Sequence, residues 1–123
     1  MREITWNNES ALNQHLVITS DDFDQTNGNA AHKYSIHVGG SESGAVTVAM
    51  QFQNGPLQEA GINGISEEAL LAVVIDRLQC FQTSQYACRE NALALTKLEE
   101  AVHWLGHRTQ SRRRREVEGT SKV

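Results

Sequence analysis

Three side chains with recognition chemistry lie close to one short turn of the sequence. Phe81 ends an apolar helical stretch, and Arg89 and Asn91 open the next one. The expected connection between the stretches is only Gln-Thr-Ser-Gln at residues 82–85, which makes the helices antiparallel neighbours. An aromatic ring, a cation and an amide are therefore expected together at the closed end of a helical hairpin, as a recognition site.

Each of the three has an alternative role. Phe81 also fits as a cap of the hairpin core, and its spacing does not separate that role from a stacking platform for a base. Asn91 lies on the apolar side of its helix, where an unpartnered amide costs about 1–3 kcal/mol, so it needs the backbone or a base edge as partner. For Arg89 a surface ion pair, for example with Asp76 or Glu90, is favoured, although it stays a candidate ligand residue.

A second pattern has metal-ligand spacing. Glu100, His103 and His107 follow one another at three- and four-residue steps, which can aim side chains at one ion. A di-metal site needs a matching motif on a facing helix, and that helix offers only Asp76, so a solvated face is favoured. The sequence also lacks phosphate-loop, dinucleotide, nucleophile-elbow and paired-cysteine motifs. We expect no metal, no cofactor and no enzyme.

The elements that must position these residues follow from periodicity. An apolar seam at alternating four- and three-residue steps predicts one helix from Cys88 onward. Its members are Asn91, Leu95, Leu98, Val102 and Leu105. A facing helix is predicted from Ser66, its N-cap, to Phe81. Its stripe consists of Leu71, Val74, Leu78 and Phe81.

The residue pattern in the first half of the chain predicts strands. Three short runs are rich in β-formers and partly alternating, at residues 15–19, 33–38 and 46–52. They indicate an α+β fold, with a small N-terminal antiparallel sheet, one face of it wet, and a C-terminal antiparallel helical hairpin with a long last helix. We expect a single domain over residues 1–123. Its parts are a β-rich region at 1–64, the hairpin at 65–116 and a tail at 117–123.

Composition sets further limits. The 123 residues carry a net charge of −4, while Arg112 to Arg115 crowd the C-terminal end. Nucleic-acid binding is disfavoured by the negative charge and by the lack of aromatic residues within the basic run. With no secretory signal and no apolar run of membrane-spanning length, we expect a cytosolic protein in which Cys80 and Cys88 are reduced, buried thiols.

A family resemblance rests on three motifs. The stretches QFQNGPLQEAGINGISEEALLAVVIDRL and YACRENALALTKLEEAVHWL, with the closing VEGT, resemble the Thoeris anti-defense family of bacteriophages. The resemblance covers roughly residues 50–120 closely and the rest loosely. Its hairpin is shared with a second phage family that counters cyclic-oligonucleotide defences.

This resemblance implies a function. Similar proteins bind a cyclic ADP-ribose isomer, an alarm signal made by the host, and sequester it without cleaving it, which places the protein in the host bacterial cytoplasm. The positions of Phe81, Asn91 and Arg108 are expected to serve in stacking, base recognition and phosphate contact, with Arg112 as a further candidate at the basic end. Members of the hairpin family also trap cyclic di- or trinucleotides in a separate pocket built by oligomer contacts. Here Thr96 and Lys97 are candidates for it, but no motif fixes them.

Helix geometry then implies an oligomer. Asn91 and Arg108 are 17 residues apart, about 25 Å along one helix, whereas the ligand spans on the order of 10 Å. If both bind it, the pocket must lie between two protomers whose long helices are antiparallel. Leu93 and Trp104, off the seam, also favour self-association. The rival interpretation is a dimeric DNA-binding regulator whose Arg112 to Arg115 contact phosphates. A third interpretation is a hydrolase.

Overall fold

The computed structural model describes residues 2–20, 30–39 and 46–114, in two compact units. One unit consists of Met1–Gly55 with Ile62–Gly64, and the other of Pro56–Gly61 with Ile65–Val123. The predicted α+β class is confirmed, because an antiparallel sheet is followed by helices of which the last is long. The single-domain organisation stays a prediction. The expected tail at 117–123 and Arg115 lie outside the described residues.

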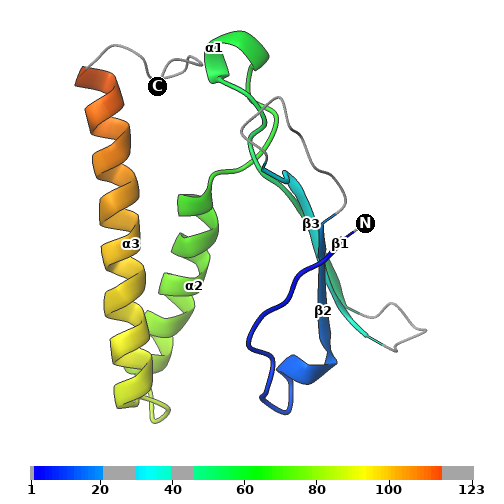
Figure 1. Cartoon of the computed structure of the whole chain (residues 1–123). Helices are drawn as coiled ribbons and strands as arrows, with labels where there is room; N and C mark the ends of the chain where they lie inside the picture. Colours follow the sequence, from blue (N-terminus) through cyan, green and yellow to red (C-terminus); the bar gives the residue numbers. More distant parts are fainter. Residues whose placement is uncertain (1, 21–29, 40–45, 115–123) are drawn as a thin grey trace. The chain divides into compact units, whose positions relative to one another are not determined.

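The first unit is a four-stranded antiparallel sheet in the order β1-β2-β3-β4 (Figure 1). Its strands are β1 Arg2–Glu3, β2 Leu16–Ser20, β3 Lys33–Val38 and β4 Thr47–Gln51, and the short 3-10 helix η1 Asn13–His15 precedes β2. The three predicted strands are confirmed to within one residue at each end. Strand β1 and the 3-10 helix were not predicted, because two or three residues are too few to show a period.

The register of the strands explains the alternation in the sequence. Ile18 lies opposite Ile36, and Ile36 opposite Val48, so one face of the sheet is apolar. Thr19 and Ser35 pair on the other, more polar face. The two faces therefore differ in composition, as the strand pattern predicts, but the polar face is not uniformly wet, because Thr19 is buried there.

A network of amides holds the chain after β4. The side-chain oxygen of Asn63 accepts a hydrogen bond from the Asn54 N–H at 2.8 Å, and its amide nitrogen donates to the Asn54 carbonyl at 2.7 Å. Gln53 Oε1 accepts from the Asn63 N–H at 3.0 Å, and Gln51 Nε2 donates to the Asn63 carbonyl at 2.8 Å. Residues 51–54 and Asn63 therefore join two backbone segments.

Gly64 is next to this network and has no room for a side chain. A Cβ atom there would come within 2.5 Å of the carbonyl carbon of Phe52 and 2.6 Å of the backbone nitrogen of Gln53. The two backbone segments therefore approach one another as closely as only glycine permits.

The second unit is a helical hairpin. A short helix α1, Leu57–Ala60, precedes α2, Glu67–Gln82, and α3, Arg89–Arg114, and Figure 1 shows α2 and α3 side by side. Ser66 is the N-cap of α2, as predicted, and its hydroxyl accepts a hydrogen bond from the Ala69 N–H at 3.1 Å. The four residues of α1 were not predicted.

The seam of α3 is half-buried while the rest of the helix is mostly exposed. It continues past the predicted members at the same four- and three-residue steps. The half-buried members are Asn91, Leu95, Leu98, Val102, Leu105, Thr109 and Arg112. On α2 the prediction of Val74 was wrong, because that side chain is 41% exposed and Ile75 is half-buried instead. A four-residue step from Leu71 to Ile75, followed by three to Leu78, matches the spacing on α3.

Candidate functional site

The described structure separates the predicted site residues into two groups. Phe81, Arg89 and Asn91 lie at the closed end of the hairpin, where α2 ends and α3 begins. Arg108 and Arg112 lie in the last two turns of the same continuous helix. Because α3 is unbroken, Asn91 and Arg108 are about 25 Å apart along its axis. One chain therefore brings together the aromatic, the amide and one cation, but not the two distal arginines.

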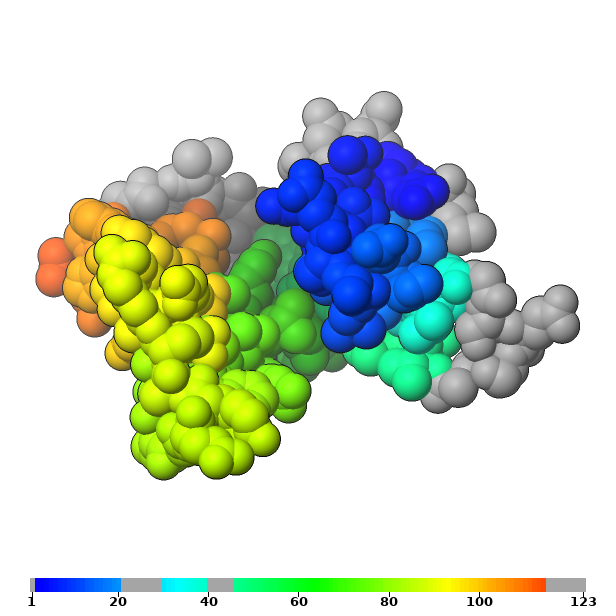
Figure 2. All heavy atoms as spheres, turned by 90° about the horizontal axis from the view of Figure 1, so that it is seen from below, coloured from blue at the N-terminus to red at the C-terminus, as the bar shows by residue number. Residues whose placement is uncertain are grey.

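The ring of Phe81 is held between two side chains. The Arg77 Cζ atom lies 4.9 Å from the ring centroid, in cation–π contact. The Tyr86 ring is perpendicular to Phe81, at 89° with 6.3 Å between centroids. Phe81 is half-buried, whereas Tyr86 and the turn around it are exposed. Figure 2 is seen from the side of this closed end, and the turn is coloured yellow-green. The arrangement forms an aromatic corner at the tip of the hairpin.

The side chain of Gln82 fixes the start of α3. Its Nε2 donates to the Cys88 carbonyl at 3.1 Å, and its Oε1 accepts from the Cys88 N–H at 3.1 Å. Cys88 in turn caps α3, because its Sγ accepts a hydrogen bond from the Asn91 N–H at 3.4 Å. Both Cys80 and Cys88 are free and exposed, so the expectation of buried thiols was wrong.

Hydroxyl groups hold the rest of the turn. Thr83 Oγ1 donates to the Cys80 carbonyl at 2.8 Å, and Ser84 Oγ donates to the Phe81 carbonyl at 2.7 Å. The Ser84 hydroxyl also accepts from the Tyr86 N–H at 3.1 Å. The backbone on both sides of the aromatic corner is therefore fixed by its own side chains.

The carboxamide of Asn91 is placed to receive a partner. The residue is half-buried at the first position of the α3 seam. Within the described part of the chain, this carboxamide makes no hydrogen bond, whereas the backbone N–H of Asn91 donates to Cys88 Sγ. A half-buried amide with unused donor and acceptor atoms can recognise an edge of a base.

The cations differ in their surroundings. Arg108 Nη2 lies 4.0 Å from Glu68 Oε1, which joins the first turn of α2 to the distal part of α3. Arg112 is half-buried at the end of the seam. Arg89 is exposed, and the expected surface ion pair with Asp76 or Glu90 is not present among residues 2–20, 30–39 and 46–114. Arg89 thus remains a cation for which the described residues supply no counter-ion.

The histidines of α3 pack on a tryptophan. The Trp104 ring lies edge-on to His103 at 5.6 Å and to His107 at 5.7 Å between centroids. Glu100 pairs with Lys97, with 3.7 Å between its Oε2 and the ammonium nitrogen. Within the described ranges no three His, Cys, Asp or Glu side chains cluster closely enough to hold a metal ion.

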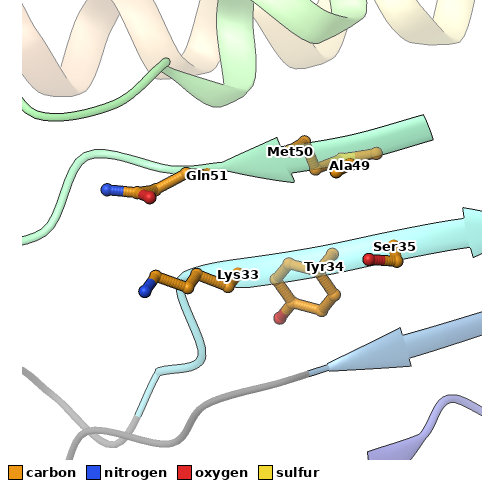
Figure 3. Close-up of a pocket in the computed structure, with 6 residues that line it drawn as sticks. All are labelled: Lys33, Tyr34, Ser35, Ala49, Met50 and Gln51. Atoms are coloured by element: carbon orange, nitrogen blue, oxygen red, sulfur yellow. The ribbon is translucent and has the colours of Figure 1, made fainter.

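Hollows of the surface occur away from the closed end. One of about 430 Å³ on α3 is lined by Thr96, Glu99, Glu100 and His103. Another, of about 230 Å³, lies on β3 and β4 and is shown in Figure 3. Its lining residues are Lys33, Tyr34, Ser35, Ala49, Met50 and Gln51. Neither hollow includes Phe81, Asn91 or Arg108.

Sequence reasoning missed three residues of the closed end. Arg77 lies four residues before Phe81, one helical turn away, and this spacing is a signal for a side-chain pair. Tyr86 and Gln82 belong to the turn, where only the folded path of the backbone brings them against Phe81 and Cys88. No helix in the described residues is both long and apolar enough to cross a membrane.

One comparison with known proteins matches the hairpin, and another matches nearly the whole chain. Residues 44–110 match the family model described as the Acb2/Tad1 hairpin domain. The chain is also 42% identical, over 141 aligned positions, to a protein of Bacillus phage SBSphiJ7 named Thoeris anti-defense 1. That alignment covers 98% of this chain and 98% of the phage protein.

Proposed function

Since the chain belongs to the Thoeris anti-defense family and carries its Acb2/Tad1 hairpin domain, we propose that this phage anti-defense protein is a sponge for a signalling nucleotide. The nucleotide is a cyclic ADP-ribose isomer, which the protein binds and keeps intact in the host cytoplasm, so that the Thoeris effector is starved of its signal. The observation that carries the proposal is the closed end, where the Phe81 ring is held by Arg77 and Tyr86 and where the Asn91 carboxamide has unused hydrogen-bonding atoms.

The chemistry of the ligand matches the residue types of the site. Its adenine would stack on Phe81, and the edge of the base would hydrogen-bond to the Asn91 carboxamide. Its pyrophosphate needs cations, for which Arg108 and Arg112 are the candidates, because a guanidinium binds a phosphate with two parallel hydrogen bonds. Arg89 is a further cation at the closed end, without an ion pair among the described residues.

The pocket is proposed to lie between two protomers. A ligand on the order of 10 Å cannot reach from Asn91 to Arg108 of one chain, since about 25 Å of helix separates them. Antiparallel packing of two α3 helices brings Phe81 and Asn91 of one protomer to Arg108 of the other. A two-fold dimer then has two identical pockets, and larger assemblies would be built on this dimer.

Binding alone suffices for this function. The proposed site consists of an aromatic, an amide and cations, and it contains no nucleophile with an adjacent base. Sequestration also needs no metal, so we propose that the protein is not an enzyme.

One assay separates a sponge from a hydrolase. The protein is incubated with the cyclic ADP-ribose isomer, separated from free ligand, heated and analysed for what it releases. Recovery of the intact cyclic isomer in proportion to the protein supports the sponge. A linear product would mean an enzyme, and no retained ligand would refute the proposed function.

A second ligand class is proposed on the strength of the shared hairpin. Cyclic di- or trinucleotides would need a pocket near Thr96 and Lys97, but the hollow at Thr96 is also lined by Glu99 and Glu100. These carboxylates repel phosphates, so cations from another protomer would have to complete the pocket.

The rival function, a DNA-binding regulator, makes different predictions. Such a protein would bind duplex DNA with a steep salt dependence, and the cyclic ADP-ribose isomer would not stabilise it against heat.

A further inference from the structure

The carboxylate of Glu68 is partly withdrawn from water, although it lies in the first turn of α2. Its side chain is 34% exposed as a whole, but the Oε1 atom is buried. Within the described part of the chain this atom accepts no hydrogen bond. An ionised oxygen that lacks both water and a donor needs a positive charge nearby. That charge belongs to Arg108, whose Nη2 lies 4.0 Å from Oε1.

The hairpin brings this pair together. Because α2 and α3 are antiparallel, the first turn of α2 is level with the distal part of α3. Arg108 comes three residues after Leu105, about 60° round the helix from that member of the seam, so its side chain can reach α2. The turn that carries Glu68 is fixed by the Ser66 hydroxyl, which accepts from the Ala69 N–H. Glu68 is therefore an anion on a fixed backbone, next to a long and exposed cation.

The distance between the two groups is that of an ion pair and not of a hydrogen bond. Hydrogen bonds from a guanidinium to a carboxylate are about 2.7–2.9 Å long. At 4.0 Å, Glu68 attracts the Arg108 guanidinium without using its N–H donors. Among the described residues this guanidinium donates no hydrogen bond, and the side chain is 57% exposed. Arg108 is thus held from one side and keeps its donors for an anion that arrives from solvent.

We propose that Glu68 is a positioning residue for phosphate binding, because it holds the Arg108 guanidinium from the side of α2 and so directs its N–H donors toward the pyrophosphate of the ligand. This inference rests on the proposed function, in which Arg108 contacts that pyrophosphate. An unrestrained arginine on a helix surface has many rotamers, and it loses them when it binds an anion. An arginine that is already restrained loses fewer, so the ligand binds more tightly.

The carboxylate of Glu68 also repels a phosphate, so the sign of its net effect has to be argued. The ligand breaks no hydrogen bond between Glu68 and Arg108, since none exists at 4.0 Å. A phosphate on the exposed edge of the guanidinium is farther from Glu68 than the guanidinium itself is. The repulsion is therefore weaker than the attraction that holds the cation. Removal of the Glu68 charge is accordingly expected to weaken ligand binding.

The test uses Glu68→Gln in the full chain, which removes the charge and keeps the size of the side chain. Isothermal titration with the cyclic ADP-ribose isomer should show a dissociation constant about fivefold higher, as expected from the cost of ordering one long side chain. In an Arg108→Ala background the same substitution should have no further effect, because no guanidinium remains to be positioned. A second readout needs no ligand: nuclear magnetic relaxation of the Arg108 Nε–Hε bond should report larger motion in Glu68→Gln than in the wild type.

Glu67→Gln is the matched control. It removes the same charge from the same first turn of α2, but the side chain is exposed and has no ion pair among the described residues. It should change the dissociation constant by less than about twofold. Unchanged or tighter binding by Glu68→Gln, an equal effect of Glu67→Gln, or a further loss in the Arg108→Ala background would overturn the positioning role. Failure of the wild-type protein to retain the isomer would refute the sponge instead, and the motion of the Arg108 Nε–Hε bond would still decide whether Glu68 holds Arg108.

Discussion

The carboxamide of Gln82 binds both the N–H and the carbonyl of Cys88, each at 3.1 Å, so that the last residue of α2 is tied to the residue that caps α3. This pairing imitates the exchange of hydrogen bonds between two strands, but it is made by one side chain. It joins the two helices at the end of the hairpin where Phe81 and Asn91 lie.

Loss of this clamp should loosen the hairpin. Gln82→Ala removes both hydrogen bonds, and because they are solvent-accessible we expect a loss of about 1 kcal/mol in the free energy of unfolding. Gln85→Ala, in the same exposed turn, is the control and should leave stability nearly unchanged. Urea titration followed by circular dichroism measures the difference. Equal stability of the two variants would mean that the hydroxyl contacts alone hold the turn.

Two glycines should respond in opposite directions to the same substitution. Gly64→Ala forces a Cβ to within 2.5 Å of the Phe52 carbonyl carbon and should destabilise the protein by more than 1 kcal/mol, since the backbone must move. At Gly106, inside α3, a Cβ meets nothing within 4 Å. Gly106→Ala should therefore stabilise the protein by up to about 1 kcal/mol through helix propensity. The signs of the two melting-temperature shifts provide the test, and shifts of the same sign would contradict the geometry.

Phe81→Ala should reduce ligand affinity more than stability. A lost stacking contact is worth about 1 to 3 kcal/mol, so the dissociation constant for a cyclic ADP-ribose isomer should rise about fivefold to 150-fold. Val73→Ala truncates another apolar side chain of α2, one that is 65% exposed, and should leave affinity unchanged. Isothermal titration and melting curves on the same samples separate the two effects. An unchanged affinity would assign Phe81 to the hairpin core.

Ligand binding should survive chelators, because no residue of the proposed site needs a metal. The protein is treated with EDTA, desalted and titrated with the cyclic ADP-ribose isomer, and the affinity should match that of untreated protein. Loss of binding that zinc restores would instead give Glu100, His103 and His107 a role as ligands.

The shared pocket predicts complementation between two inactive chains. Asn91→Ala damages one side of each pocket, and Arg108→Ala damages the other. In a heterodimer of the two variants one pocket carries both lesions and the other is intact. Titration after verified subunit exchange should recover about one binding site per heterodimer. Complete absence of recovery would refute the shared pocket.

The features that the sequence predicts well depend on residue types and spacings within one short segment. Ser66 marks the start of α2 because a hydroxyl before a helical period is a cap. The strands β2, β3 and β4 follow from runs of β-formers. Phe81 and Asn91 were predicted to share the closed end because the turn is short. Strand β1 and helix α1 were missed, since two to four residues carry no measurable period.

The features that it does not predict depend on the direction of side chains. Val74 and Ile75 are both apolar neighbours on α2, and only the packed hairpin decides which of them is exposed. Gln82 reaches Cys88 across a turn whose path no local rule specifies. Tyr86 likewise meets Phe81 through that path, and so the aromatic corner emerged only from the structure.

None of the apolar side chains in the described residues is fully buried. In the proposed dimer, a chain with so little interior would obtain hydrophobic stabilisation from association, and folding and assembly would become one equilibrium. The population of folded protein would then depend on how much of the chain is present. Early in infection, when few copies exist, assembly and the capacity to bind the signal would be lowest, and both would rise together as more chains are made.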